Sequence, residues 1–183
     1  MSLFLIMVNI KNVFAILICV QYSSCSFLPL EGVITEKSIM KTSYLLTHTY
    51  PTPVLYFNTI GGDVHAGIQL MHVLLNMDNV TCIAKKAHSM GFAIFQTCNR
   101  RYVIPESELM QHQIQILFKG TLESSVLFIK NTINIQVWLL DIQARKIKVD
   151  PLLLYTRFVL GEWFLNSSEA IKYNCADKII NVN

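Results

Sequence analysis

The sequence predicts an α/β protein with one domain, because short strand-like runs alternate with segments of helical periodicity along its 183 residues. Residues 53–59, "PVLYFNT", form a β-branched and aromatic run, and residues 80–84, "VTCIA", are typical of a buried strand. Between them, residues 64–77, "VHAGIQLMHVLLNM", repeat apolar side chains every three or four positions, which indicates a helix. This order favours a sheet covered by helices.

The elements that follow continue the same alternation. A glycine pair at 61–62 ends the first strand in a tight turn, because glycine accepts backbone angles that other residues resist. Residues 90–98, "MGFAIFQTC", predict an apolar helix after the second strand. The runs "RYVI" (101–104) and "ELMQH" (108–112) then predict two strands separated by Pro105. The middle of the chain is therefore expected to be β-α-β-α-β.

The most regular part of the chain is residues 122–148, which predict one long amphipathic helix. Polar residues fill its other faces. Its apolar side chains step by three or four positions, namely Leu122, Val126, Ile129, Ile133, Val137, Leu140, Ala144 and Ile147.

The C-terminal part is predicted to contain two shorter helices and a strand. Residues 151–160 begin with a proline, which suits the first turn of a helix. Residues 167–174 predict a short helix capped by Ser167 or Ser168. Residues 178–182 are expected to form a closing strand.

The composition is unusually apolar for a soluble domain. Charged residues make up 15% of the chain, against roughly 25% in an average domain, while 52% is hydrophobic and the mean hydropathy is +0.42. Such a surplus needs a membrane segment, a subunit interface, or both. The net charge of +3 is spread thinly, so a nucleic acid is not an expected partner.

Residues 1–26 are predicted to be a hydrophobic leader, either a signal peptide or a membrane anchor, ahead of a domain over residues 27–183. One lysine precedes the apolar run "VFAILICV" (13–20), and small residues follow it, as in secretory signals. This pattern indicates the secretory pathway or a membrane. Its apolar parts are too short to span a bilayer, so the alternative is a segment packed on the domain, in an organelle or the cytoplasm.

The cysteines show no close pair of the kind that binds zinc or performs redox chemistry. We interpret the last three as buried, unpaired side chains that act as small hydrophobic residues. The sequence accordingly predicts no metal site and no cofactor. The five are Cys19, Cys25, Cys82, Cys98 and Cys175.

Ser89 is the first candidate functional residue, because it stands between the polar turn "KKAH" and an apolar helix. A serine there either caps the helix or acts as a nucleophile, and a nucleophile needs a base. His112, at the end of a predicted strand, is the histidine best placed to be that base. The N–H of Met90 and those of the glycine turn would stabilise an oxyanion. The other histidines are His48, His65, His72 and His88.

Four segments together resemble the proteolytic subunit of the Clp protease. They are "YFNTIGGDVHAG" (56–67), "AHSMGFAIF" (87–95), "RYVIPESELMQHQ" (101–113) and "EWFLNSSEAIKYNCADKI" (162–179). The resemblance covers residues 27–181 and implies the crotonase-like (ClpP-like) fold, a spiral of β-β-α units with a long protruding helix. Ser89 then resembles the family's nucleophile and His112 its base. Gly62 and Met90 resemble the backbone donors of its oxyanion hole.

The resemblance also implies a serine endopeptidase that cleaves short or unfolded polypeptides. Its subunits, identical or related, would form rings that interlock through residues 122–148. Glu162 resembles the third member of the triad, but it is one methylene longer than the family's aspartate. The family's N-terminal region, which helps it dock to an AAA+ unfoldase, has no counterpart here, so the sequence gives no basis for that partner.

Three other hypotheses remain. A non-catalytic pseudopeptidase would keep the fold and the interface, and Glu162 in place of aspartate favours it. An acyl-CoA hydratase or isomerase of the crotonase group would use acidic residues such as Glu106 and Glu108. A membrane-bound signal-peptide peptidase would use a Ser-Lys dyad, with Lys85 or Lys86 as the base.

Overall fold

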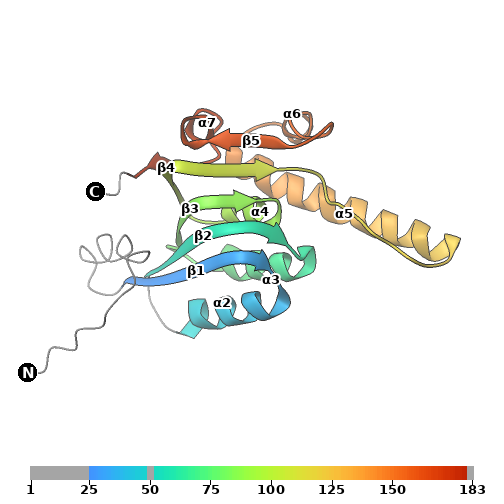
Figure 1. Ribbon diagram of the computed structural model, residues 1–183, viewed down its shortest axis with the longest axis horizontal. Helices are drawn as coiled ribbons and strands as arrows, with labels where there is room; N and C mark the ends of the chain where they lie inside the picture. Colours follow the sequence, from blue (N-terminus) through green and yellow to red (C-terminus); the bar gives the residue numbers. More distant parts are fainter. Residues whose placement is uncertain (1–24, 49–51, 181–183) are drawn as a thin grey trace, which may run out of the picture.

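The computed structural model describes residues 25–48 and 52–180, and it confirms a single mixed α/β domain (Figure 1). In this part of the chain, six strands form one sheet with helices packed around it. The strands are β1 (Cys25–Ile34), β2 (Thr52–Gly62), β3 (Thr81–His88), β4 (Arg100–Gln111), β5 (Trp163–Asn166) and β6 (Lys178–Ile179). The helices are α2 (Glu36–His48), α3 (Val64–Leu75), α4 (Met90–Phe95), α5 (Leu122–Ile147), α6 (Pro151–Tyr155) and α7 (Ser167–Lys172).

The sheet brings the ends of three strands together. Strands β1 to β4 are adjacent in sequence order and parallel, with α2, α3 and α4 as the crossover connections. Strand β5 pairs antiparallel with β4, and β6 pairs in parallel with the start of β4. The carboxyl ends of β3 and β4 therefore meet the beginning of β5 at one end of the sheet.

The core is built around α4, whose six residues are all buried. Phe57 of β2 is fully buried, and its ring meets the ring of Phe95 edge-on, with centroids 5.5 Å apart. Burying a side chain of this size stabilises the fold by about 1.5–3 kcal/mol. Packing on every side leaves α4 little freedom, which fixes the backbone directly after Ser89.

Strand β4 is continuous, which corrects the prediction of two strands separated by Pro105. The register of its pairing with β3 shifts within the strand. Val103 lies opposite Ala84, and the next paired residue of β4, Glu108, lies opposite Lys86. The residues between those partners on β4 bulge outward, and a bulge tolerates proline because it needs no ladder donor there.

The helices α4, α6 and α7 are shorter than predicted. Turns follow each of them, and they end at Phe95, Tyr155 and Lys172 instead of at 98, 160 and 174.

The cap of α7 is Asn166, which corrects the prediction of Ser167 or Ser168. The Asn166 side chain accepts a hydrogen bond from the backbone N–H of Glu169, and the Glu169 carboxylate accepts one from the N–H of Asn166. This reciprocal capping box satisfies two donors at the start of the helix.

Helix α5 spans nearly the predicted range and projects from the sheet as a long rod (Figure 1). Thr121 caps its start, and Lys148 ends it in the left-handed conformation, with φ 62°. Its C-terminal part packs on the domain, where Leu139, Ile142, Ala144 and Ile147 are buried. The apolar stripe of the projecting part is exposed, at Leu122, Val126, Ile129, Ile133 and Val137.

None of the helices within 25–48 and 52–180 is long and apolar enough to cross a membrane. Residues 1–24 of the predicted leader lie outside the described residues, and residues 25 and 26 open β1.

Cys82 and Cys98 form a disulfide, which corrects the prediction that both are unpaired. Their Cα atoms lie 6.0 Å apart, and both side chains are fully buried. Helix α4 turns the chain back on itself, so two positions 16 residues apart in sequence meet in the core. Cys175 is a buried free thiol, as predicted, and burial raises its pKa to about 12.

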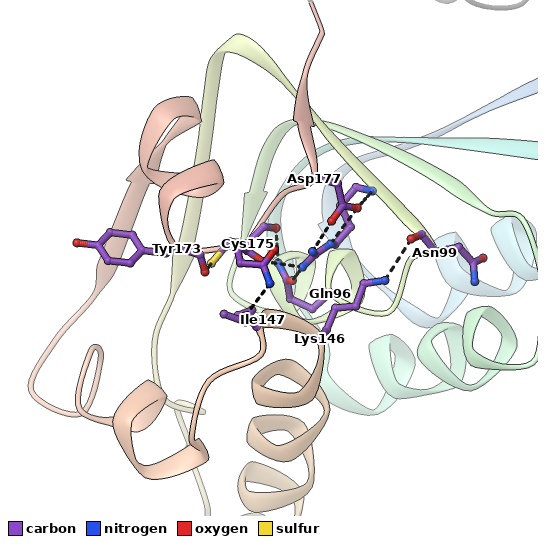
Figure 2. Close-up of polar contacts among 9 residues, drawn as sticks. Gln96, Asn99, Lys146, Ile147, Tyr173, Cys175 and Asp177 are labelled. Carbon is purple, nitrogen blue, oxygen red and sulfur yellow. Dashed lines mark hydrogen bonds and ion pairs between the residues drawn. The ribbon is translucent and has the colours of Figure 1, made fainter.

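Arg101, at the start of β4, ties distant segments together through a buried charge (Figure 2). Its guanidinium is 2% exposed and donates to both Asp177 carboxylate oxygens, at 2.5 and 3.3 Å. It also donates to the Gln96 side chain at 2.5 Å and to the Asn174 carbonyl at 3.0 Å. Burial alone would raise the pKa of Asp177, but the hydrogen bonds and charge of Arg101 outweigh burial and lower it.

The end of α5 joins the same network (Figure 2). Lys146 Nζ donates to the carbonyl of Asn99 at 3.2 Å, and Asn174 Nδ2 donates to the carbonyl of Ile147 at 2.8 Å. The network therefore fixes α5 relative to β4 and to the turn after α7.

Candidate functional site

Ser89 joins β3 to α4 in a backbone conformation that serine rarely adopts. Its φ is 53° and its ψ is −121°. Such a conformation costs a residue with a Cβ about 1–3 kcal/mol. The Ser89 N–H donates to the Met110 carbonyl at 2.8 Å, and the Ser89 carbonyl accepts from the N–H groups of Phe92 and Ala93. The surroundings therefore hold the strained turn in place.

The Ser89 side chain does not cap α4. It accepts no hydrogen bond from the first turn of the helix, and its hydroxyl has no hydrogen-bond partner among the described residues. The side chains of Thr121 and Asn166, by contrast, do cap α5 and α7, with extended backbones. The geometry thus removes the cap interpretation, and it leaves Ser89 half-buried with no partner for its hydroxyl among the described residues.

Gly61, at the end of β2, lies against Ser89. A Cβ at position 61 would stand 2.7 Å from the Cβ of Ser89, 2.8 Å from the carbonyl oxygen of His88 and 3.1 Å from the backbone nitrogen of Met90. Gly61 has φ 89°, a value that L-residues avoid. Glycine is therefore required here both by the backbone and by the space.

The two predicted oxyanion donors, Met90 and Gly62, lie in different surroundings. The N–H of Met90 occupies the first position of α4, where no intrahelical acceptor is available, beside Ser89. Gly62 pairs with Ile34 of β1, and a Cβ on it would meet the Ile34 carbonyl oxygen at 2.3 Å. The structure thus brings Gly61 and Met90 against Ser89, with Gly62 one residue further along and packed on β1.

His112 and Glu162 lie at the same end of the sheet as Ser89. Ser89 follows the last residue of β3, His112 follows Gln111 at the end of β4, and Glu162 precedes Trp163 at the start of β5. Gln111 pairs with Trp163, so the next position along both strands sets His112 opposite Glu162. His112 is half-buried and Glu162 is exposed. Within the described part of the chain, the three side chains make no hydrogen bond or ion pair with one another.

Two glutamines of α5, which the sequence analysis missed, hold the segment that carries His112. Gln143 is fully buried, and its Oε1 accepts from Nε2 of Gln111 at 2.7 Å. The Oε1 of Gln136 accepts from the N–H of Ile114 at 2.8 Å. The two glutamines are one heptad apart on one side of the helix, and this polar pair beside an apolar stripe is the signal that would reveal them.

His88 has partners other than Ser89. Its Nε2 lies 2.9 Å from Oε1 of Glu108, and its ring packs edge-on against Phe164. Burial lowers the pKa of His88, although the charge of Glu108 opposes the shift. Glu108 also lies 3.6 Å from Nζ of Lys86, so these groups interact with one another instead of with Ser89.

The chain is similar to known proteins of one family. A relative, the ATP-dependent Clp protease proteolytic subunit of Deinococcus radiodurans, is 26% identical over 132 residues. The matched region covers 69% of this chain and 64% of the relative, so the chain spans somewhat less than two thirds of the relative's length. The family model described as Clp protease matches residues 30–183. Because that match covers most of the sequence, the chain belongs to the Clp protease family.

Proposed function

We propose that this chain is a serine endopeptidase of the Clp type, which hydrolyses peptide bonds in short or unfolded polypeptides. Ser89 is the nucleophile, His112 the general base, and Glu162 the acid that orients His112. One observation carries the proposal: Ser89 combines a strained positive-φ turn with a hydroxyl that has no hydrogen-bond partner among the described residues. Strain of this kind persists only where its surroundings enforce it, and it clusters at active sites.

The proposed chemistry is acyl transfer. The imidazole of His112 takes the proton of the Ser89 hydroxyl while Oγ attacks the carbonyl carbon of the scissile peptide. The N–H groups of Met90 and Gly62 stabilise the oxygen that becomes negative. His112 then protonates the leaving amine, and water hydrolyses the acyl-enzyme by the same route. Glu162 holds the tautomer and orientation of His112 without taking a proton.

The positions of His112 and Glu162 at the strand ends support this triad, although the three side chains are not hydrogen-bonded to one another. His112 and Glu162 occupy facing positions just beyond the last pair of the β4–β5 ladder. Catalytic hydrogen bonds are often long or poorly aligned before substrate binds. We therefore expect a bound polypeptide to bring the side chains of Ser89, His112 and Glu162 into contact.

We also propose that copies of this chain, alone or with related subunits, assemble through α5. Its projecting part exposes Ile133 to 57% and Val137 to 58%, along with the rest of its apolar stripe. Monomeric soluble proteins rarely expose large contiguous apolar patches, so a ring that covers the stripe fits this surface. The ATP dependence in the name of the Deinococcus relative concerns that protein, since peptide hydrolysis by Ser89 itself consumes no nucleotide.

The proposal is tested with the full-length protein, a fluorogenic peptide and a serine-reactive fluorophosphonate. Ser89→Ala and His112→Ala should each reduce cleavage on the order of thousands-fold, because triad members act as a unit. His112→Ala should also abolish labelling of Ser89. His65→Ala, at an exposed position of α3, is the matched control and should behave like the wild type. A wild-type protein that assembles but neither cleaves nor reacts would overturn the proposal.

A pseudopeptidase is the second candidate, because Glu162 is exposed and makes no hydrogen bond or ion pair with His112. Glu162→Asp introduces the aspartate that the family has at this position, and it should change the cleavage rate. The rate should rise if the longer side chain of Glu162 orients His112 imperfectly. Glu162→Ala should lower the rate. An unchanged rate in Glu162→Ala would remove this residue from the site.

A further inference from the structure

A concave feature away from the candidate site lies between the end of α5, α6, β5 and α7. It is a cavity of about 280 Å³ lined by two aromatic rings, Trp163 and Tyr173, and by three basic residues, Lys148, Arg157 and Lys172. No acidic residue belongs to its lining, and neither do Ser89, His112 or Glu162. We call it the basic pocket.

Two of its cations are held against one ring. Cζ of Arg157 lies 4.9 Å, and Nζ of Lys172 lies 5.5 Å, from the centroid of the Tyr173 ring. Trp163 packs against the same ring nearly edge-on, with centroids 5.7 Å apart. Attraction to the ring, about 0.5–1 kcal/mol for an exposed cation, helps to position each of these cations without neutralising it.

The positive charges of the basic pocket have no carboxylate partner among the described residues. Three of the acids near these cations in sequence are engaged elsewhere, since Asp150 caps α6, Glu169 completes the capping box of α7, and Asp177 pairs with Arg101. Glu162, next to Trp163, is exposed and forms no ion pair with these cations. Three basic residues therefore line a hollow whose own lining supplies no counter-charge.

We propose that the basic pocket binds an oxyanion of the phosphate class. A phosphate group carries a charge of about −1.5 to −2 at neutral pH and offsets most of the three positive charges, whereas one carboxylate offsets a single charge. The volume of about 280 Å³ lies below the range of roughly 300–1,000 Å³ typical of sites for drug-sized ligands.

The bound oxyanion would add a further link between three segments that line the pocket. Lys148 ends α5, Arg157 follows α6, and Lys172 ends α7. The ion would thereby stabilise the C-terminal part of the domain around Trp163, the residue directly after Glu162. This inference stands apart from the proposed peptidase activity, because binding is measured without any substrate.

Binding is tested by titrating the full-length protein with inorganic phosphate, by calorimetry and by thermal unfolding. Ionic strength is held constant with sodium chloride. We expect saturable binding, and a Tm that rises with the logarithm of phosphate concentration, because the ligand binds only the folded state. Sodium acetate at the same ionic strength should give no comparable shift. An equal response to chloride would show only charge screening and would overturn the proposal, and an equal response to acetate would overturn the phosphate class.

Variants locate the site. Arg157→Gln and Lys172→Gln should each weaken phosphate binding about tenfold or more, since each removes a charge-assisted contact. Lys130→Gln is the control, because it removes the same charge from an exposed position of α5 outside the pocket. If a glutamine variant does not fold, the alanine variant at the same position, Arg157→Ala or Lys172→Ala, takes its place. If that variant does not fold either, the wild-type titration decides whether the protein binds phosphate. Unchanged phosphate affinity in folded Arg157→Gln and Lys172→Gln would place the ion elsewhere.

Discussion

A Cβ added at Gly61 would lie 2.7 Å from the Cβ of Ser89, which is closer than two carbon atoms pack in proteins. Only a hydrogen atom fits between the end of β2 and the turn that begins α4. Ser89 therefore cannot relax its positive φ by moving toward β2, and the two turns hold each other in place.

Gly61→Ala should destabilise the protein more than a glycine substitution elsewhere. Gly32→Ala is the matched control, because Gly32 also has a positive φ, 71°, but its Cβ would meet nothing within 4 Å. Left-handed strain alone costs about 1–2 kcal/mol, and the clash with Ser89 should add about 1–3 kcal/mol. Urea unfolding of both variants measures the difference. Equal losses would show that the contact with Ser89 is unimportant.

Substitutions of Ser89 should reveal the strain directly. Ser89→Gly should raise the free energy of unfolding by about 1 kcal/mol, because glycine tolerates this conformation and part of the gain is lost to its greater freedom when unfolded. Ser89→Ala should change stability by less than about 0.5 kcal/mol. Loss of a capping serine would instead cost about 1 kcal/mol. Such a loss in Ser89→Ala, measured by thermal unfolding, would reinstate the cap interpretation.

Asp177 should make the protein sensitive to acid. Its pKa is lower in the folded chain, so its contribution is complete above the ordinary aspartate value, about 3.9, and is lost as pH falls through the folded pKa. Asp177→Asn should lower the free energy of unfolding at pH 7 by about 2 kcal/mol and flatten its fall below pH 4. The control is Asp141→Asn, which breaks an exposed pair with Arg145 worth about 0.3–0.5 kcal/mol. Equal effects of the two substitutions would contradict the role given to Arg101.

The cysteines of the core should resist alkylation in the native protein. Burial raises the pKa of Cys175 to about 12, so almost no reactive thiolate exists near pH 8. Peptide mass spectrometry after iodoacetamide treatment should find Cys175 modified only on denaturation. Cys82 and Cys98 should be modified only after denaturation and reduction. Alkylated Cys82 in native, unreduced protein would argue against the disulfide.

The stripe of α5 should control assembly. Ile133→Asp with Val137→Asp places two charges on the exposed apolar face, where association would bury them unpaired. We expect the domain to remain folded, because both side chains are exposed in the single chain, and the oligomer to dissociate in sedimentation experiments. Asn131→Asp with Asn134→Asp adds the same charges at exposed polar positions and should leave assembly intact. Identical sedimentation of both double variants would exclude this face as the interface.

Helices and strands with a regular repeat of apolar residues were predictable from the sequence, because that repeat depends only on which face of the element is buried. The limits of α5 follow from its repeat, and the strand-helix order from residue 53 to residue 95 was also correct. Contacts between distant segments were not predictable. The pairing of Cys82 with Cys98 depends on how α4 turns, and the use of Asn166 as a cap depends on the position of Glu169. Pro105 ended a strand in the prediction, whereas Ser107 stabilises the bulge by donating to the Ala84 carbonyl at 2.5 Å.

The candidate site was likewise predictable only in its local features. A serine before a glycine-containing helix and a histidine after a strand are local signals, and the sheet carries Ser89 and His112 to the same end. Their catalytic roles stay predictions. The side chains that support them come from elsewhere in the sequence, as with Gln143, which holds Gln111 from the C-terminal part of α5. Gly61, rather than Gly62, makes the close approach to Ser89, and the second glycine lies against Ile34 of β1.

The partnership of Arg101 with Asp177 sets an order of events while the ribosome makes this chain. The two residues are 76 positions apart, so the arginine is synthesised about 4–15 s before its partner at roughly 5–20 residues per second. Until then, burying the guanidinium would leave a charge unpaired in the core, at a cost of about 3–5 kcal/mol. The nascent sheet is therefore expected to remain open at the start of β4, and to close only when the segment after α7 has left the exit tunnel.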